Sequence, residues 1–290
     1  MSLPALLPSP ATHPRLDGAA SRIDASTKQP YLIIENLDEG KLRVVKINRK
    51  KAKNGFDSNL YLCISDALNQ AAKDDSVLVV ILTGEGEYFS SGADLRAEMA
   101  GDVEGLKFGK GSAYDPVGVF MRTFLRFPKP LIAAVNGPAM GVGCTMLPHC
   151  DIVYASETAS FLVPFSRIAV VPEFCSSVTF PKLLGTSTAN EMLLFGKPLG
   201  AQRACELGLV SQVFKQDKFL DQVVAEVRKG LVFPLLDRTL PLFKNMLKKW
   251  DQDHLEQICL YELEMLDQRA ENGDTAEAII AFMSQGKSKM

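Results

Sequence analysis

The 290-residue chain has one tryptophan, three histidines and no excess of either charge sign. Its formal net charge is −2, which does not favour nucleic acid or an anionic membrane surface as a partner. No apolar run reaches the roughly 18 residues that a membrane-spanning helix needs. The histidines, His13, His149 and His254, are scattered without the spacing of metal ligands, so we expect no metal site.

Cysteine is present, but not in a pattern that would form a disulfide framework. None of the six cysteines belongs to a C-x-x-C pair, and most of them stand in apolar segments. Disulfide frameworks are typical of small secreted domains, whereas this chain is long enough to bury a sizeable core. We therefore expect free, buried thiols in a reducing compartment.

Residues 1–29 show no hydrophobic periodicity and contain four prolines, which predicts a flexible leader. They lack a basic region followed by a long apolar one, so they do not resemble a secretory signal. Arg15 and Arg22 would suit a mitochondrial presequence, but Asp17 and Asp24 argue against one.

From residue 30 the chain alternates between strand and helix patterns. Three segments are continuous apolar runs, as parallel strands buried on both faces require: 77–82, 131–135 and 151–155. The elements expected before them are strands at 31–34 and 42–48 and a helix at 58–72. This alternation predicts an α/β core over residues 30–214, with right-handed crossovers between parallel strands.

After Gly185 the pattern becomes helical, and we assign residues 215–290 to a helical C-terminal region. The helices expected after Gly185 are 189–195, 201–207, 219–229, 241–250, 254–271 and 275–285.

Two Gly-rich turns follow predicted strands, at residues 90–95 and 136–143. Helices are expected to start near Ala93 and Met140. The first N–H groups of a helix have no partner within it and carry partial positive charge, so they suit an anion or a carbonyl oxygen. Either turn alone fits an ordinary strand-to-helix connection, but two similar turns in one sheet favour a paired site for an oxyanion.

Glu173 places one carboxylate next to a mainly apolar stretch, residues 161–171. An apolar environment raises the pKa of a carboxyl group and makes its anion a stronger base. The candidates for that environment are Phe161, Phe165, Ile168, Val171 and Phe174. The alternative is a surface glutamate that precedes a helix starting near Ser176. One base and one oxyanion site suffice to move a proton beside a carbonyl group.

Together these motifs resemble those of the crotonase, or enoyl-CoA hydratase/isomerase, superfamily over about residues 31–214. The matching segments are FSSGADL at 89–95, AVNGPAMGVGC at 134–144 and DIVYAS at 151–156. The resemblance implies a β-β-α superhelix with a C-terminal helical trimerisation region, and a homotrimer or a dimer of trimers. It also implies an acyl-CoA thioester as substrate and no separate cofactor, because coenzyme A is part of that substrate.

The same resemblance assigns roles to individual residues. The N–H groups of Ala93 and Val142 would form the oxyanion hole, and Glu173 would be the catalytic base. The expected substrate-binding residues are Lys51, Ala52, Ser91, Gly92, Asp94, Leu95, Gly141, Phe165 and Phe174. Asp94 also fits a residue that only shapes its turn. Residues 106–127 are expected to line the acyl pocket, although Phe120, Met121 and Phe124 fit a helix core equally well.

Departures from the hydratase pattern decide the expected reaction. Hydratases carry two glutamates that handle a water molecule, and Thr145 and Phe165 stand at those positions here. Glu173 follows Phe165 by eight residues, and residues 171–177, 179–182 and 191–193 resemble peroxisomal Δ3,Δ2-enoyl-CoA isomerases. We therefore predict conversion of 3-enoyl-CoA to trans-2-enoyl-CoA by transfer of one proton through Glu173, in the β-oxidation of unsaturated fatty acids.

Three other functions stay open at this point. The first is another crotonase reaction, such as isomerisation of a dienoyl-CoA or a step of secondary metabolism. The second is a non-catalytic scaffold that binds acyl-CoA. The third is a hydratase that uses a displaced acid, for which Glu191 is the nearby candidate.

The final tripeptide, Ser288-Lys289-Met290, resembles the small-basic-apolar peroxisomal signal typified by S-K-L. It would bind the peroxisomal import receptor, and we expect a peroxisomal location, with the mitochondrion or the cytoplasm as alternatives. A frayed polar helix end would give the same three residues.

Overall fold

The computed structural model of the protein describes residue 18 and residues 21–95, 115–271 and 273–287. Three expectations therefore fall partly or wholly outside the described residues. They concern most of the leader, the first part of the expected acyl-pocket segment 106–127, and the tripeptide Ser288-Lys289-Met290.

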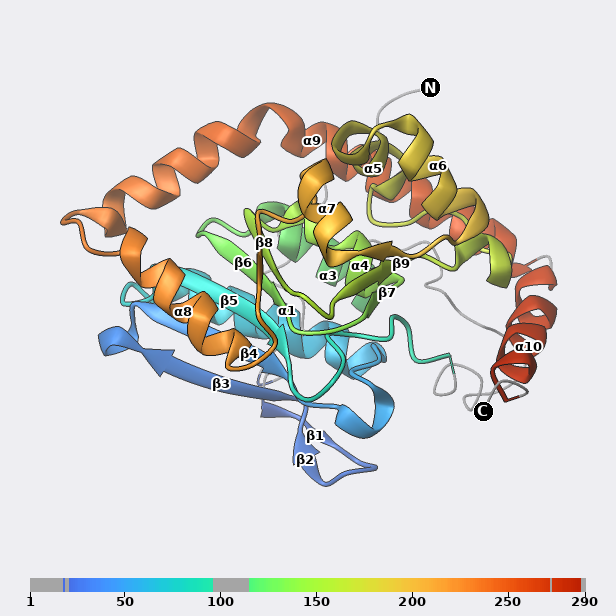
Figure 1. Ribbon diagram of the computed structural model, residues 1–290, viewed down its shortest axis with the longest axis horizontal. Helices are drawn as coiled ribbons and strands as arrows, with labels where there is room; N and C mark the ends of the chain where they lie inside the picture. The colour runs from blue at the N-terminus through green and yellow to red at the C-terminus, as the bar shows by residue number, and fades with distance from the viewer. Residues whose placement is uncertain (1–17, 19–20, 96–114, 272, 288–290) are drawn as a thin grey trace.

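The core is a six-stranded sheet with the strand order β11-β8-β6-β5-β4-β3 (Figure 1). Only β3 and β4 pair in antiparallel fashion, and every other neighbouring pair is parallel. The strands are β3 (Leu32–Leu37), β4 (Leu42–Ile47), β5 (Val79–Gly84), β6 (Leu131–Val135), β8 (Ile152–Ser156) and β11 (Gln212–Phe214).

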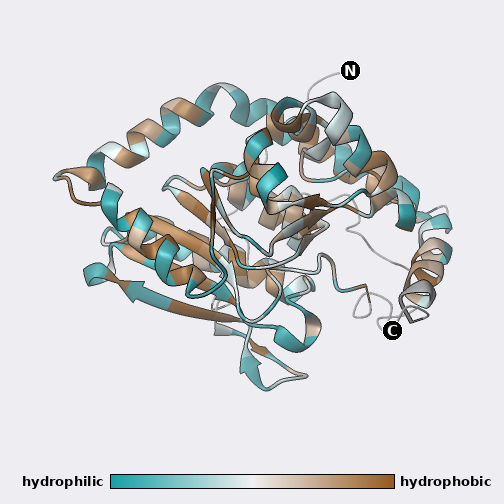
Figure 2. Ribbon diagram, viewed as in Figure 1, coloured by the Kyte–Doolittle hydropathy of each residue, from teal (hydrophilic) through white to brown (hydrophobic). Residues whose placement is uncertain are grey.

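Both faces of this sheet are covered, which explains the continuous apolar runs. Along β5, Val80 and Leu82 pack into one core cluster with helices α1 (Ser58–Lys73) and α3 (Pro116–Arg126). The alternate residues, Val79 and Ile81, pack into a second cluster with α8 (Phe219–Gly230). Figure 2 accordingly shows the central strands as hydrophobic over most of their length. A parallel sheet between two helical layers has no face that a polar residue could occupy freely.

A second, three-stranded sheet lies beside the carboxyl ends of the first, with the order β10-β9-β7. Its strands are β7 (Ala139–Met140), β9 (Ser160–Leu162) and β10 (Leu199–Gly200). The short helices around it are α4 (Val142–Thr145), η5 (Leu147–His149), η6 (Phe165–Ile168), α5 (Ser176–Leu184), α6 (Thr186–Phe195) and α7 (Ala201–Leu207).

The chain before the core is more ordered than the sequence pattern predicts. The expected flexible leader runs to residue 29, whereas β1 (Ile23–Asp24) and β2 (Gln29–Pro30) form a small hairpin. Asp24 is buried in this hairpin and forms an ion pair with the guanidinium of Arg49, at 3.0 Å. The two residues are 25 positions apart, so the local sequence pattern does not predict this ion pair.

The C-terminal helices also differ from expectation. The sequence predicts separate helices at 241–250 and 254–271, whereas α9 runs without interruption from Leu236 to Glu271. The residues between the two predicted helices include neither glycine nor proline, and the side-chain amide of Gln252 donates to the carbonyl of Leu125 on α3. That contact holds the middle of α9 on the core. Within the described residues, no helix has the length and hydropathy needed to cross a bilayer.

The helix expected from Met140 towards Leu147 is shorter than predicted. α4 ends at Thr145, and the next turn is the 3₁₀ helix η5. Pro148 lies in η5 and has no N–H to continue an α-helix, which explains the early end. The last helix, α10 (Asp274–Lys287), packs against η6.

We expect the aromatic cluster under α3 to contribute much of the core's stability. The Phe120 ring is fully buried, and its centroid lies 4.7–5.7 Å from those of Phe56, Tyr61, Phe124 and Phe174. Phe120→Ala should lower the free energy of unfolding by about 3–5 kcal/mol, measured by urea denaturation. Phe195→Ala, the same change at a side chain that is 72% exposed, should alter it by less than about 0.5 kcal/mol. Equal losses from both variants would contradict this packing.

Candidate active site

The two Gly-rich turns lie side by side, because they follow the neighbouring strands β5 and β6. The N–H of Met140 donates to the carbonyl of Ser90 at 2.9 Å, and the N–H of Ser90 donates to the carbonyl of Pro138 at 3.2 Å. Gly92 has φ +84°, and a Cβ there would lie only 2.9 Å from the carbonyl oxygen of Met140. Glycine is therefore required for this backbone approach.

Each turn presents a backbone N–H, that of Ala93 or that of Val142, for which the described residues offer no acceptor. The N–H of Asp94 donates to the carbonyl of Phe56, and the N–H of Phe56 donates to the carbonyl of Gly92. This pairing directs the N–H of Ala93, the residue between them, away from Phe56. Val142 is the first residue of α4, so its N–H has no partner within the helix. Among the described residues, none accepts a hydrogen bond from either group. Two such amides can bind an oxygen that gains negative charge during a reaction.

A cavity of about 480 Å³ brings these turns together with Glu173. Eight of the residues predicted from the sequence line it: Ser91, Gly92, Ala93, Leu95, Gly141, Val142, Phe165 and Glu173. Much of the remaining wall is apolar and includes Leu263 and Leu266 of α9 and Phe282 of α10. The cavity can therefore hold an apolar chain while one end of that chain meets the polar groups.

Glu173 is half-buried between η6 and α5, in a wall that also contains Phe165, Ile168 and Val170. Burial, followed by the negative charge of Glu262 as a smaller cause, raises the pKa of Glu173 to about 7. A carboxyl group that ionises near neutral pH can both accept and return a proton.

Glu173 begins a turn whose next two residues have left-handed backbone conformations, with φ +54° at Phe174 and +60° at Cys175. Neither residue is glycine, so the turn depends on contacts from outside it. The Nε2–H of His149 donates to the carbonyl of Phe174 at 2.8 Å, and the N–H of Cys175 donates to Glu262. Burial lowers the pKa of His149 to about 4, so its ring is neutral at physiological pH.

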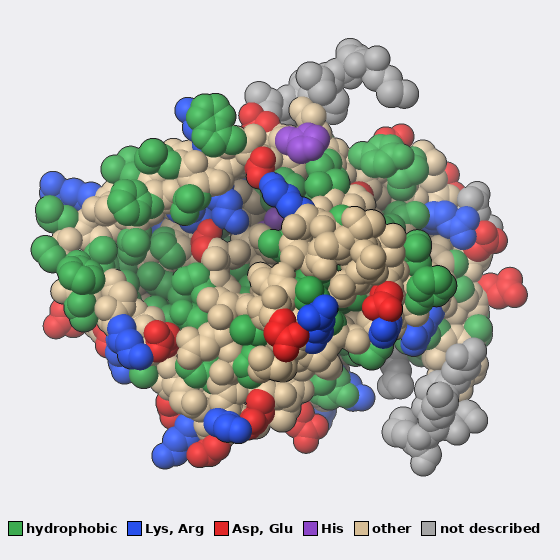
Figure 3. Space-filling model, turned by 45° about the horizontal axis from the view of Figure 1, so that its top comes forward, with side chains coloured by type: hydrophobic (Ala, Val, Ile, Leu, Met, Phe, Trp, Pro, Cys, Tyr) green, Lys and Arg blue, Asp and Glu red, His purple; other side chains and the backbone are tan. Residues whose placement is uncertain are grey.

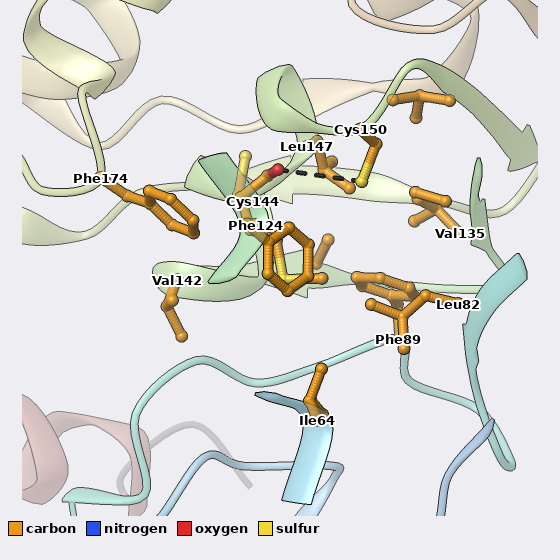
Figure 4. Close-up of a cluster of buried hydrophobic side chains, with 14 of the residues drawn as sticks. Ile64, Leu82, Phe89, Phe124, Val135, Val142, Cys144, Leu147, Cys150 and Phe174 are labelled. Atoms are coloured by element: carbon orange, nitrogen blue, oxygen red, sulfur yellow. Dashed lines mark hydrogen bonds between the residues drawn. The ribbon is translucent and has the colours of Figure 1, made fainter. Parts of the chain in front are cut away.

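Phe174 does not contact the cavity, contrary to its predicted role in substrate binding. Its left-handed backbone turns the ring into the core, where it stacks on His149 at 4.3 Å and is fully buried. Figure 4 shows the ring directed at the same cluster of buried side chains as Phe124 and Val142.

The other predicted binding residues outside the cavity wall are Asp94, Lys51 and Ala52. The carboxylate of Asp94 forms an ion pair with Arg49 at 3.1 Å, which supports its role in shaping the turn. Lys51 is exposed on the 3₁₀ helix η4 (Lys50–Ala52). The carbonyl of Ala52 accepts the hydroxyl of Ser91 at 3.2 Å, so η4 lies against the first Gly-rich turn without entering the cavity.

Sequence reasoning missed three residues that support the site: His149, Arg49 and Glu262. Arg49 is buried and forms ion pairs with Asp24, Asp57 and Asp94, which gives no local sequence signature. Glu262 did carry a signal, because it interrupts an apolar helical stripe formed by Cys259, Leu263 and Leu266.

The positions of the hydratase glutamates offer no acid here. Thr145 is completely buried, and Phe165 is an apolar part of the cavity wall. Glu191, the alternative acid, is exposed on α6 and pairs with Lys197 at 2.7 Å. Besides Glu173, the described cavity wall contains one carboxylate, Asp115, which caps α3 by accepting the N–H of Gly118. No three His, Cys, Asp or Glu side chains of the described chain are placed to hold a metal ion.

A family model described as enoyl-CoA hydratase/isomerase matches residues 38–290. The chain belongs to this family. The match spans the sheet from β4 onwards, both Gly-rich turns and the C-terminal helices. It supports an enzyme that acts as an enoyl-CoA hydratase or isomerase, and the family acts on acyl-CoA thioesters.

Individual relatives agree with this assignment. Human enoyl-CoA delta isomerase 2 is 36% identical over 275 residues, covering 94% of this chain and 69% of that protein. Mouse peroxisomal enoyl-CoA delta isomerase 3 is 33% identical over 268 residues, covering 92% of this chain and 83% of that protein. The chain spans 62% of the rat enoyl-CoA delta isomerase 2.

The solved structures confirm the fold. A crystal structure of an enoyl-CoA hydratase/isomerase from Pseudoalteromonas atlantica superposes with a TM-score of 0.79 and 29% identity. The superposition covers 88% of this chain and 97% of that one. The expected α/β crotonase-like fold, with a sheet core followed by C-terminal helices, is therefore correct.

The raised pKa of Glu173 predicts a pH-dependent stability that needs no substrate to measure. An unfolded glutamate ionises near pH 4.5, whereas folded Glu173 keeps its proton up to about pH 7. Between these values the unfolded state binds fewer protons, so stability falls as the pH rises. Relative to the wild type, Glu173→Gln should therefore gain about 1–3 kcal/mol above about pH 8 in urea denaturation.

This gain should vanish below about pH 4, where both states hold the proton. Glu264→Gln, the same change at an exposed position on α9, should show no such pH dependence. A gain for Glu173→Gln that is equal at both pH values would contradict the raised pKa.

Proposed function

We propose that the protein is a Δ3,Δ2-enoyl-CoA isomerase, which moves the double bond of a 3-enoyl-CoA to the trans-2 position. One observation carries this proposal. A single carboxyl group with a pKa near neutrality shares a cavity wall with two backbone N–H groups that no described residue uses.

In the proposed reaction, the carboxylate of Glu173 takes a proton from C2 of the substrate. The electrons of the broken C2–H bond move towards the carbonyl, and the thioester oxygen becomes the negative end of a dienolate. The N–H groups of Ala93 and Val142 bind that oxygen and stabilise the charge. The protonated Glu173 then gives its proton to C4, so the double bond forms between C2 and C3 and the carbonyl is restored.

This reaction needs one acid–base group and no water, which matches the composition of the cavity wall. Hydration would need further groups to activate and orient a water molecule. Thr145 and Phe165 cannot act as acid or base at those positions, and Glu191 lies outside the cavity. The names of the human and mouse relatives, both enoyl-CoA delta isomerases, support the same choice.

We propose a peroxisomal location and a role in the β-oxidation of unsaturated fatty acids. The name of the mouse relative supports the compartment. The tripeptide Ser288-Lys289-Met290 would bind the import receptor.

We also propose that the protein assembles as a homotrimer or a dimer of trimers. The first half of α9 and the residues before it expose many large apolar side chains, and Figure 3 shows them gathered towards the left of that view. They include Phe233, Leu242, Phe243, Met246, Leu247 and Trp250, each at least 59% exposed. An apolar surface of this kind is typical of a subunit contact.

The role of Glu173 can be tested directly with 3-hexenoyl-CoA and longer 3-enoyl-CoA substrates. Glu173→Gln keeps the size of the side chain but removes the base, so kcat for formation of 2-enoyl-CoA should fall about 10²–10⁴-fold. Binding of the CoA thioester, measured by calorimetry, should change little. Glu191→Gln, at the exposed glutamate on α6, serves as the control and should keep wild-type turnover. Unchanged turnover in Glu173→Gln would refute the mechanism.

Substrate preference separates the proposed reaction from its alternatives. In the described cavity wall, the one carboxyl group besides Glu173 is that of Asp115, which caps α3, so hydration of 2-enoyl-CoA should be at least about 10²-fold slower than isomerisation of 3-enoyl-CoA. The assays would compare 2-enoyl-CoA, 3-enoyl-CoA and 3,5-dienoyl-CoA under identical conditions. A preference for the dienoyl substrate would identify a dienoyl-CoA isomerase, and rapid hydration would identify a hydratase.

A further inference from the structure

Glu262 lies almost completely buried on α9, 5% exposed, and it contacts the turn that carries Glu173. Its carboxylate accepts the N–H of Cys175, the N–H of Ser177 at 3.1 Å and the hydroxyl of Ser177. These three donors stand at the start of α5, two to four residues after Glu173. A side chain of α9 thus accepts the hydrogen bonds of a turn that lies about 85 residues earlier in the chain.

The Glu173 turn needs such an anchor because Phe174 and Cys175 both have positive φ. His149 holds the carbonyl of Phe174 from one side, and Glu262 holds the N–H of the next residue from the other. The Cys175 thiol also donates to the carbonyl of Leu255 on α9, at 3.1 Å. Without Glu262, the buried N–H of Cys175 and the N–H of Ser177 would lose their acceptor, and the turn would be free to adopt a less strained conformation.

We propose that Glu262 is a positioning residue of the active site, which fixes the turn carrying Glu173 and places a second carboxylate beside that base. The inference rests on the proposed function, because it gives Glu262 a part in the same proton transfer.

The hydrogen bonds decide which of the two carboxylates carries the negative charge. Burial raises the pKa of Glu262 to about 7, although its bonds from Ser177 and Cys175 favour the ionised form and limit that rise. For Glu173, burial and the charge of Glu262 both act to raise the pKa. Because these donors bond Glu262, they favour the charge on Glu262 and the proton on Glu173.

The other ionisable groups around this turn do not offer an alternative source of the effect. His149 is neutral, as its lowered pKa shows. The Cys259 thiol is hydrogen-bonded to Cys175 and buried, which raises its pKa and keeps it neutral. On η6, Arg167 bonds the carbonyls of Phe195 and Gly196, and Arg269 at the end of α9 pairs with Asp274. Asp115 is occupied as the cap of α3.

The test is the pH profile of kcat/KM for 3-enoyl-CoA isomerisation. Glu262→Gln keeps an amide oxygen as acceptor but removes the charge, so the midpoint of the acidic limb should move about one pH unit lower. Glu264→Gln removes the same charge from an exposed position two residues along α9, and its midpoint should stay at the wild-type value. A midpoint in Glu262→Gln equal to that of the wild type would overturn the inference.

Glu262→Asp separates the two parts of the role. It keeps the negative charge but withdraws it by one methylene from the donors of Cys175 and Ser177. The midpoint should then stay near that of the wild type, while kcat falls about tenfold because Glu173 is less well placed. Should Glu262→Gln fail to fold, this variant still decides the matter, since wild-type kcat in Glu262→Asp would refute the positioning role.

Infrared difference titration without substrate gives a readout that does not depend on activity. The spectrum of the wild type minus that of Glu173→Gln isolates the carboxyl band of Glu173. The same difference is then taken between the Glu262→Gln single variant and the variant that carries both Glu262→Gln and Glu173→Gln. In that difference, the titration midpoint of the Glu173 band should be about one pH unit lower. A shifted band in a protein without isomerase turnover would refute the proposed function alone. Normal turnover with an unshifted band would refute only the role of Glu262.

Discussion

The close approach of Gly92 to the carbonyl of Met140 is the contact on which the rest of the site depends. It holds the starts of the two Gly-rich turns, which follow neighbouring parallel strands, against each other, as the proposed oxyanion site of Ala93 and Val142 requires. A side chain at residue 92 would meet backbone rather than a flexible group, so the two turns would have to separate. The sheet beneath the turns is packed on both faces, so its strands cannot shift to accommodate that separation.

Glu173, the proposed base, is not held in place by the sheet. The donors come from strand ends that the sheet fixes, whereas Glu173 stands on a strained turn without glycine. Its position therefore depends on groups from distant segments, namely His149 after the second Gly-rich turn and Glu262 on α9. The hydrogen bond from His149 to Phe174 links the segment after the second Gly-rich turn to the turn that carries Glu173. The hydrogen bond from Cys175 to Glu262 links that same turn to α9. The C-terminal helices thus line the cavity and also hold the turn that carries Glu173.

Local patterns predicted the strands of the core, both Gly-rich turns and Glu173, because each of these depends on residues adjacent in sequence. The errors concern long-range contacts. Phe174 was expected to bind substrate, but the backbone at residue 174 turns its ring onto His149, which is 25 residues away in the sequence. The ordered hairpin before the core depends on Asp24 and Arg49, which are 25 residues apart. Nothing in the sequence around either residue indicates that pair.

The buried carboxylate of Glu262 near the half-buried carboxylate of Glu173 reduces stability, so its presence calls for a physical explanation. Replacing Glu262 with an apolar residue would remove the charge repulsion but leave the N–H groups of Cys175 and Ser177 without an acceptor. A neutral amide would satisfy only part of this hydrogen bonding, because its NH₂ group cannot accept. A carboxylate can accept all three bonds at once, and the charge that it brings favours the proton on Glu173. The same group thus bonds the N–H groups of the turn and, in the proposed mechanism, keeps the pKa of Glu173 high enough for it to act as a base.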